Sequence, residues 1–243
     1  MRNGLFITGT GTGVGKTVIT AALARYMQER GCDIGVMKPI ETGSSQDEPP
    51  SSDAYRLRQA SRSGQSLDSV CPYRFPDPIA PLAAAHRRGK TIDLFSIQTH
   101  YRRLQDQFEW VLVEGVGGLM VPLTKQETVR DLIQLLDLPC LVVGHATLGG
   151  VNHLLLTLEA LENVHIQVLA IILIQCEAST NQDIQNLQMA STIDLARTLS
   201  KPPVLGPLRY VEAFNRDWEE GINRLQHQDA IKNLADLLMQ RLT

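Results

Sequence analysis

Lys16 and Thr17 end a glycine-rich segment, and residues of these types could hold the phosphates and the metal ion of a nucleotide. The segment reads GTGTGVGKT from Gly9 to Thr17. Backbone N–H groups of such a loop bind phosphate oxygens, the lysine reaches the β- and γ-phosphates, and the hydroxyl ligates Mg²⁺. The standard spacing puts a glycine at position 10, where this chain has a threonine. The segment therefore predicts a site for ATP and Mg²⁺, with an unusual loop spacing.

Three charged residues are candidates to complete this site. Glu114 follows the apolar stretch 110–113 and precedes a glycine-rich turn, so it would lie beside the loop if the two strands were neighbours. Asp53 opens a short predicted helix, where acidic residues are also common as caps. Lys38 ends another apolar stretch, and a second cation there could serve a reacting group. We interpret Glu114 and Asp53 as candidate metal ligands and Lys38 as a candidate catalytic residue.

Predicted strands and helices alternate along the chain, and these elements must position the candidate residues. Apolar runs without polar alternation are typical of strands buried on both faces. These runs cover residues 4–9, 34–38, 110–115, 140–144 and 168–174, with a weaker one at 203–206. Helical periodicity is seen at 16–30, 93–108 and 229–242. The alternation predicts an α/β fold of one domain over 1–243, with a mostly parallel sheet, helices on both faces and ligands at the carboxyl ends of the strands.

The composition narrows the classes of function. The chain has 243 residues and a net charge of −3, which does not favour nucleic acid as a partner. Its four cysteines are scattered, without the spacing of a zinc site or a disulfide framework. The longest apolar run, at 168–174, is too short to cross a bilayer. We expect a cytoplasmic protein without nucleic-acid or membrane partners.

Several further motifs occur in a fixed order. They are MKPIETGS at 37–44, SSDA at 51–54, VLVEGVGG at 111–118, LGGVNHLLLT at 148–157 and PVLG at 203–206. Together with the loop, they resemble the dethiobiotin synthetase family of the P-loop NTPase superfamily. That family has five residues between its first glycine and Gly-Lys-Thr, as this chain has after Gly9. The resemblance covers about residues 1–210, and residues 211–243 carry no recognised motif.

The resemblance implies an ATP-dependent ligase of biotin biosynthesis. Its substrates would be 7,8-diaminononanoate, CO₂ and Mg-ATP. One amine would take up CO₂ as a carbamate, whose oxygen attacks the γ-phosphate to give a carbamic–phosphoric anhydride. The second amine would then close the ureido ring of dethiobiotin and release phosphate. Lys38 would stabilise the carbamate and the transferring phosphoryl group, and Lys16 would share that charge.

The resemblance also implies the binding residues. Mg²⁺ would be held by Thr17, Asp53 and Glu114. The nucleotide site would comprise Thr12, Gly13, Val14, Gly15, Lys16, Thr17, Asp53, Glu114, Gly115, Val116, Gly117, Gln175, Leu208, Arg209 and Tyr210. The diamine would contact Thr42, and its carboxylate would dock on Gly149, Gly150 and Asn152 of the other subunit, which implies a homodimer.

Four positions depart from the family pattern. Gln175 and Cys176 stand where Asn-Asp is usual, Arg209 replaces a common proline, and Leu82 replaces a frequent histidine. Gln keeps the amide donor and acceptor one methylene further out. The departures at 175–176 and 209 concern contacts to the base and leave its recognition open, whereas the phosphate and carbamate residues are all present.

Other nucleotide-binding proteins are alternatives. A partitioning or cluster-assembly ATPase of the deviant-loop class would act as a switch through partner proteins, but its extra loop lysine corresponds here to Gly11. A cobyrinate-type amidase needs a glutaminase domain, for which 243 residues leave no room. A nucleotide-binding module without chemistry would leave Lys38 and LGGVNH unexplained.

Overall fold

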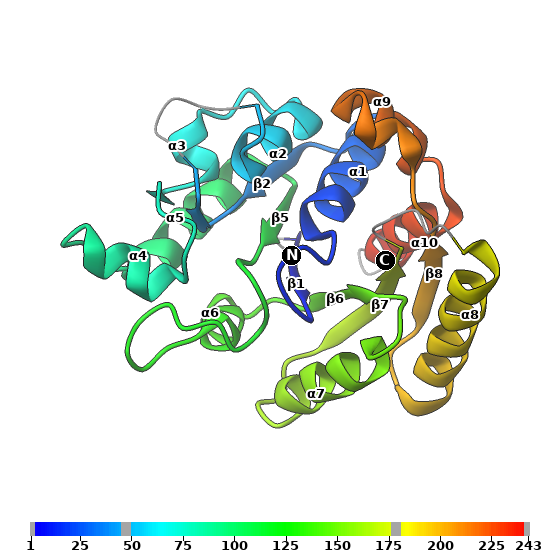
Figure 1. The fold of residues 1–243 in the computed structure, drawn as a ribbon. Coiled ribbons are helices and arrows are strands. Elements are labelled where there is room, and N and C mark those ends of the chain that lie inside the picture. The colour runs from blue at the N-terminus through cyan, green and yellow to red at the C-terminus, as the bar shows by residue number, and fades with distance from the viewer. Residues whose placement is uncertain (1–2, 45–49, 176–180, 241–243) are drawn as a thin grey trace.

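The computed structural model describes residues 3–44, 50–175 and 181–240, and its centre is a six-stranded sheet (Figure 1). Within the sheet the order is β2-β5-β1-β6-β7-β8, and every pair of neighbours is parallel. In chain order the strands are β1 (Asn3–Gly9), β2 (Ile34–Met37), β5 (Trp110–Glu114), β6 (Cys140–His145), β7 (Val168–Ile174) and β8 (Val204–Leu208). The predicted fold class is thereby confirmed.

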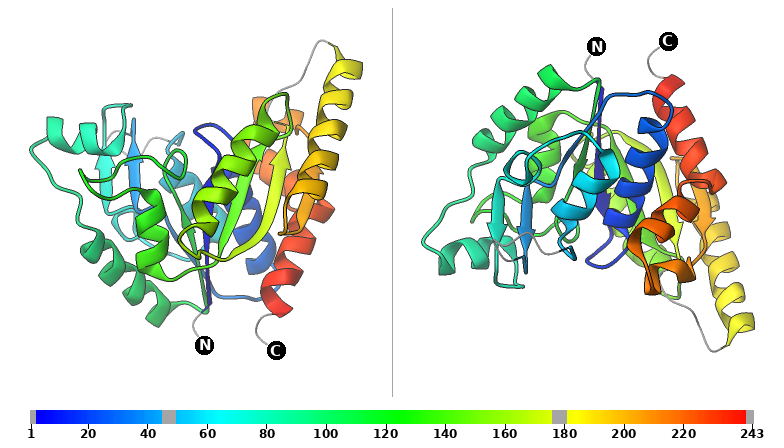
Figure 2. Two further views of the ribbon diagram at one scale, coloured as in Figure 1. Left: turned by 90° about the horizontal axis from the view of Figure 1, so that it is seen from below. Right: turned by 90° about the horizontal axis from the view of Figure 1, so that it is seen from above.

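Helices cover both faces of the sheet, as the two views of Figure 2 show. One face is packed by α1 (Lys16–Gln28), α2 (Asp53–Ser61), α3 (Leu67–Val70), α9 (Trp218–Leu225) and α10 (Asp229–Met239). The other is packed by α4 (Pro81–Arg87), α5 (Leu94–Gln107), α6 (Val129–Leu136), α7 (Gly150–Glu162) and α8 (Gln182–Leu199). No helix in the described ranges is long and apolar enough to cross a membrane.

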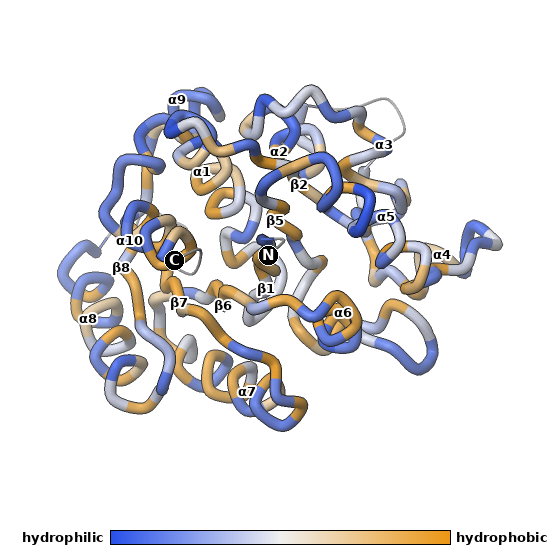
Figure 3. The backbone as a smooth tube through the Cα atoms, turned by 180° about the vertical axis from the view of Figure 1, so that it is seen from behind, coloured by the Kyte–Doolittle hydropathy of each residue, from blue (hydrophilic) through white to orange (hydrophobic). Residues whose placement is uncertain are grey.

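Alternate side chains of each strand enter opposite cores, which is why the strands lack polar alternation. In β1, Leu5 and Ile7 pack under α1, while Phe6 belongs to the core on the opposite face. All three side chains are fully buried. In Figure 3 β6 and β7 are coloured as hydrophobic, whereas α9 at the outside is mostly hydrophilic.

Strand register brings the predicted acidic ligand to the phosphate loop. β1 lies between β5 and β6, and its Ile7 is paired with Glu114 at the end of β5. The loop that follows β1 therefore begins at the edge of the sheet where β5 ends. The neighbouring strands on which the interpretation of Glu114 depended are present.

Two short strands form a small second sheet. β3 (Ile40–Thr42) and β4 (Tyr73–Phe75) pair in parallel beside the main sheet. Only three residues of each strand take part, too few for the pattern to stand out in sequence. This sheet holds the KPIETG segment against the start of α2, where Glu41 accepts from the N–H groups of Asp53 and Ala54.

Candidate nucleotide and metal site

Two glycines shape the loop between β1 and α1. Gly13 has φ of 75° and Gly15 has φ of 92°, a left-handed conformation that side chains rarely adopt. Gly15 is the N-cap residue of α1, which therefore starts at Lys16 with its first N–H groups directed at the loop. Free N–H groups and the positive end of the helix dipole make this an anion site. The turn thus supplies the backbone that a triphosphate needs.

A compact group of charged and hydroxyl side chains lies beside this loop. Lys38 Nζ is 2.8 Å from Asp53 Oδ2 and 2.5 Å from Glu114 Oε1. Thr17 Oγ1 donates a hydrogen bond of 2.8 Å to the same Glu114 oxygen. Lys16 Nζ donates to the carbonyl of Gly11 at 2.8 Å. The four residues singled out from separate parts of the sequence are therefore in direct contact, with Lys16 next to them.

Burial and mutual attraction control the protonation of this group. Burial alone would lower the pKa of Lys38, but Asp53 and Glu114 outweigh it, so the pKa lies above its ordinary value. Burial raises the pKa of the Glu114 carboxyl, and Lys38 opposes this only in part. For Lys16, burial and then the charge of Lys38 lower the pKa to about 8. The two carboxylates therefore favour the charged form of Lys38, and an incoming phosphate would favour the charged form of Lys16.

The oxygen atoms of this group fit Mg²⁺. Glu114 Oε2 is buried and has no hydrogen-bond partner among the described residues. Thr17 and Asp53 add a hydroxyl and a second carboxylate, all of them hard oxygen ligands. No group of three or more His, Cys, Asp or Glu that could hold a metal occurs in the described ranges. Two carboxylates suit Mg²⁺, which keeps waters and takes further ligands from substrate phosphates.

The group opens into a cavity of about 620 Å³. Most of the predicted residues line it, namely Thr12, Gly13, Gly15, Lys16, Thr17, Lys38, Thr42, Asp53, Glu114, Val116 and Gly117. Val14 is buried beneath the loop, and Gly115 contributes its carbonyl, which accepts from Lys38 Nζ at 3.3 Å. The predicted phosphate, metal and diamine residues thus surround one space.

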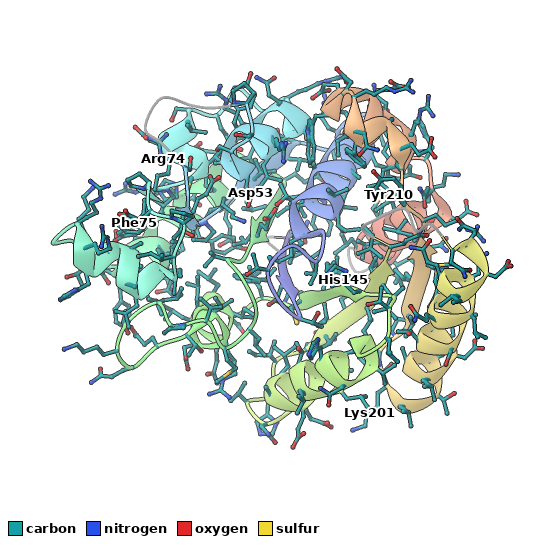
Figure 4. The ribbon with its side chains drawn as sticks, viewed as in Figure 1. Asp53, Arg74, Phe75, His145, Lys201 and Tyr210 are labelled. Atoms are coloured by element: carbon teal, nitrogen blue, oxygen red, sulfur yellow. The ribbon has the colours of Figure 1, made fainter. Side chains whose placement is uncertain are left out.

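The predicted base-binding residues gather at a second cavity of about 270 Å³. Gln175, Arg209 and Tyr210 line it together with Gly13 and Gly15. Figure 4 shows Asp53 and Tyr210 on either side of α1. Leu208 is fully buried and does not line this space; its carbonyl accepts from the Gln175 N–H at 2.9 Å. Cys176 lies outside the described residues.

Gly149, Gly150 and Asn152 are not among the residues that line either cavity. They form the start of α7, with Gly149 as its N-cap at φ of 86°. A Cβ on Gly150 would meet the carbonyl oxygen of His145 at 2.2 Å, so this turn requires glycine. The structure of one chain therefore does not bring these three predicted residues into the cavity that Lys38 lines.

Glu41 is a residue that sequence reasoning missed. Its carboxylate accepts from the N–H groups of Asp53 at 2.7 Å and Ala54 at 3.1 Å, and from the hydroxyl of Ser52 at 3.2 Å. An acidic side chain at a helix N-terminus satisfies donors that the helix leaves free. Glu41 thereby positions Asp53 opposite Lys38. Two other missed residues, Arg56 and Trp218, also line the main cavity.

Replacing Glu41 by alanine should weaken both the fold and the metal site. The variant leaves the N–H groups of Asp53 and Ala54 without their acceptor, which should cost about 2 kcal/mol of unfolding free energy. Asp53 should then be held less firmly, so the Mg²⁺ concentration for half-maximal activity should rise. Urea unfolding and a magnesium titration measure the two effects, with Glu41→Gln as the milder control. Unchanged values in Glu41→Ala would exclude this positioning role.

Comparisons with known proteins identify the relatives of this chain. A family model described as an AAA domain matches residues 3–217. ATP-dependent dethiobiotin synthetases are similar in sequence: that of Thermodesulfovibrio yellowstonii is 39% identical over 89% of this chain and 92% of its own. That of Anaeromyxobacter dehalogenans (strain 2CP-C) is 48% identical over 70% of this chain and 75% of its own. That of Bacillus velezensis is 35% identical over 83% of this chain and 84% of its own length.

Solved structures agree in fold at much lower identity. The cell division ATPase MinD of Pyrococcus furiosus has a TM-score of 0.54 and 15% identity, covering all of both chains. The MinC:MinD complex of Aquifex aeolicus has a TM-score of 0.56 and 13% identity, covering 99% of this chain and 96% of that one. These likenesses show the P-loop NTPase fold alone. The sequence relatives and the order of the motifs show that the chain belongs to the family of ATP-dependent dethiobiotin synthetases, which are ligases.

Proposed function

We propose that this protein converts 7,8-diaminononanoate, CO₂ and Mg-ATP into dethiobiotin, ADP and phosphate. The observation that carries the proposal is the position of Lys38, a buried ammonium in contact with both candidate metal ligands beside the phosphate loop. Lys38 and Thr42 line the same cavity as the loop, so a bound diamine and a γ-phosphate would share one space. The family supplies the identity of the substrates.

The chain's own residues support each part of this chemistry. The loop and Lys16 bind the triphosphate, while Thr17, Asp53 and Glu114 would hold Mg²⁺, which supplies positive charge to the β- and γ-phosphates. Lys38 stabilises the carbamate oxygen as it attacks the γ-phosphate and the negative charge that develops there. Positioning and positive charge are what phosphoryl transfer chiefly requires.

We also propose that the active protein is a homodimer in which the start of α7 binds the carboxylate of the substrate held by the facing subunit. Exposed apolar side chains on and near α7 support this interface: Met120 and Leu156 are 53% and 57% exposed, and Leu148, just before α7, is 85% exposed. Met120 and Leu156 also line a cavity of about 400 Å³ between α7 and the 118–122 segment. Large apolar side chains gathered in this way are typical of a protein interface.

We propose that the second cavity binds adenine, with Gln175 as the amide that faces the base.

We propose that the protein is located in the cytoplasm. Cys32, Cys71 and Cys140 are free thiols, which suits a reducing compartment.

The dependence of ATP hydrolysis on the diamine tests this function against a switch ATPase. Phosphate release from Mg-ATP with bicarbonate should be low without diaminononanoate and rise at least tenfold when it is added, because the carbamate is the intended acceptor of the phosphoryl group. Diaminobutane, a diamine of different length that lacks the carboxylate, is the control. Rapid hydrolysis that the diamine does not change would favour the switch.

A further inference from the structure

Two side chains stand where the main cavity and the second cavity meet. The two spaces share a small set of lining residues: Gly13, Gly15, Val18, Arg56 and Trp218. The first three belong to the phosphate loop and the first turn of α1. Arg56 belongs to α2, and Trp218 is the first residue of α9, in the segment without a recognised motif. Two remote parts of the chain therefore meet over the phosphate loop.

The two side chains are stacked on each other. The guanidinium carbon of Arg56 lies 4.2 Å from the centroid of the Trp218 ring. The indole also packs against Phe214 of the 3₁₀ helix η1 (Glu212–Asn215), with ring centroids 5.3 Å apart and the rings tilted by 50°. A cation over an indole face is attracted to it, and the planar group is held flat. Arg56 is thus oriented by Trp218 and Phe214.

The charge of Arg56 is not neutralised within the described residues. Its side chain makes no hydrogen bond or ion pair there, and its Nε is buried without a partner. Arg25, a fully buried arginine near α9, binds by contrast the carbonyl of Ala60 at 3.0 Å and the carboxylate of Glu219 at 2.8 Å. A buried polar group without a partner carries a cost that a ligand can remove. An unpaired guanidinium beside an anion-binding loop indicates a site for an anionic group.

Arg25 also explains why α9 holds its place. Its side chain is 2% exposed and joins three elements, since it starts on α1 and binds the end of α2 and the first turn of α9. Nη1 adds a contact of 3.3 Å to Asn223, one turn further along α9. The distance between Arg56 on α2 and Trp218 on α9 is therefore set by a buried connection and not by the stacking alone.

We propose that Arg56, held by Trp218, binds the α-phosphate of the nucleotide where it passes from the phosphate loop toward the base. This inference rests on the proposed function, which puts the β- and γ-phosphates at Lys16 and the base at Gln175. The α-phosphate and ribose must then cross the shared residues. The guanidinium fork matches phosphate oxygens, and the indole face offers a flat wall to the ribose. The motif-free segment 211–243 thereby gains a role in nucleotide binding.

Binding of a nucleotide that is not turned over tests the proposal independently of the reaction. The probe is the magnesium complex of β,γ-imido-ATP, titrated calorimetrically into the full-length protein. Arg56→Ala should raise its Kd roughly 10-fold or more, the range expected for a lost hydrogen bond to a charged group. Arg56→Lys should recover part of the affinity because the charge remains and the fork does not. Arg58→Ala is the matched control, since Arg58 lies on the same helix and lines neither cavity.

A structural role would give a different result. If Arg56 only packed α9 against α2, Arg56→Ala would lower the melting temperature while leaving the Kd of the folded protein within about twofold of wild type, and this result would overturn the proposal. The proposal further expects the KM for ATP to rise while kcat at saturating ATP changes only a few-fold, because Lys38 is untouched. A wild type that binds the nucleotide but forms no dethiobiotin would contradict the proposed function without affecting this test.

Trp218 gives a direct optical signal. The chain has two tryptophans, and Trp110→Phe leaves Trp218 as the only one. The magnesium complex of β,γ-imido-ATP should change the emission of Trp110→Phe protein, and that change should be lost in Trp110→Phe/Arg56→Ala. Trp218→Leu should weaken nucleotide binding about as much as Arg56→Ala. The double variant Arg56→Ala/Trp218→Leu should bind the nucleotide no more weakly than either single variant, because the two residues act as a unit. Additive losses, or emission unaffected by nucleotide, would contradict the coupling.

Discussion

Lys38→Ala is expected to lower kcat for dethiobiotin formation by roughly 10²–10³-fold, in line with the loss of one preorganised donor to developing charge. The Kd for ATP should rise less than in Lys16→Ala, because Lys16 is the residue proposed to bind the phosphates in the ground state as well. Steady-state kinetics with saturating diamine and bicarbonate give kcat, and calorimetry gives the Kd. An unchanged kcat would show that Lys38 only forms a structural ion pair.

Lys38→Ala also removes the cation from a fully buried carboxylate, so its folding must be measured alongside. Glu114 is 0% exposed, and loss of one partner of a buried pair costs about 3–5 kcal/mol when the remaining charge is uncompensated. The double variant Lys38→Met/Glu114→Gln removes both charges and should be more stable than Lys38→Ala. Lys38→Arg keeps a cation beside Glu114. If kcat is lost in this variant as well, the loss reflects the chemistry of Lys38 and not the missing charge in the fold.

Mixed dimers should recover activity that neither parent has. Lys38→Ala protomers lack the cation proposed to stabilise the transferring group, and Asn152→Ala protomers lack a group proposed to bind the substrate carboxylate across the interface. After subunit exchange a mixed dimer keeps one interface with Lys38 from one chain and Asn152 from the other. Each mixed dimer should have up to half the activity of a wild-type dimer, because one of the two sites in the mixed dimer is intact.

Size-exclusion chromatography with differently tagged protomers would prove the exchange. The control is a mixture of Lys38→Ala with Lys38→Ala/Asn152→Ala protomers, in which no intact site can form. Absence of recovery in proven mixed dimers, with a strong defect in each parent, would show that both residues serve one site within a single chain.

Much of the fold was predictable because a parallel sheet covered on both faces leaves a local signature. Each strand had to be apolar on both sides, so stretches such as 110–113 and 168–174 could be recognised by composition. Strand order was not predictable, because pairing between β1 and β5 depends on contacts far apart in the chain. The small sheet of β3 and β4 was missed because three residues carry too little pattern.

The residues of the candidate site also differ in how far they could be predicted from the sequence. Lys16 and Thr17 were predictable because a glycine-rich turn before a helix is a local motif, and Glu114 because it ends a buried strand. Glu41 was not, since its function depends on reaching the N-terminus of a different element. Arg56 lies one turn after Asp53, so helical spacing could have placed it on the same face of α2. Trp218 has no local signal, because only tertiary packing brings it over the loop.

Formation of the ureido ring from labelled bicarbonate tests the account most directly. The protein would be incubated with Mg-ATP, diaminononanoate and ¹³C-bicarbonate, and the products analysed by mass spectrometry with Lys38→Ala as the control. The account predicts dethiobiotin carrying one ¹³C atom in its ureido carbonyl, formed together with one ADP and one phosphate per ring, and nearly absent with Lys38→Ala. ATP hydrolysis without labelled dethiobiotin would contradict it.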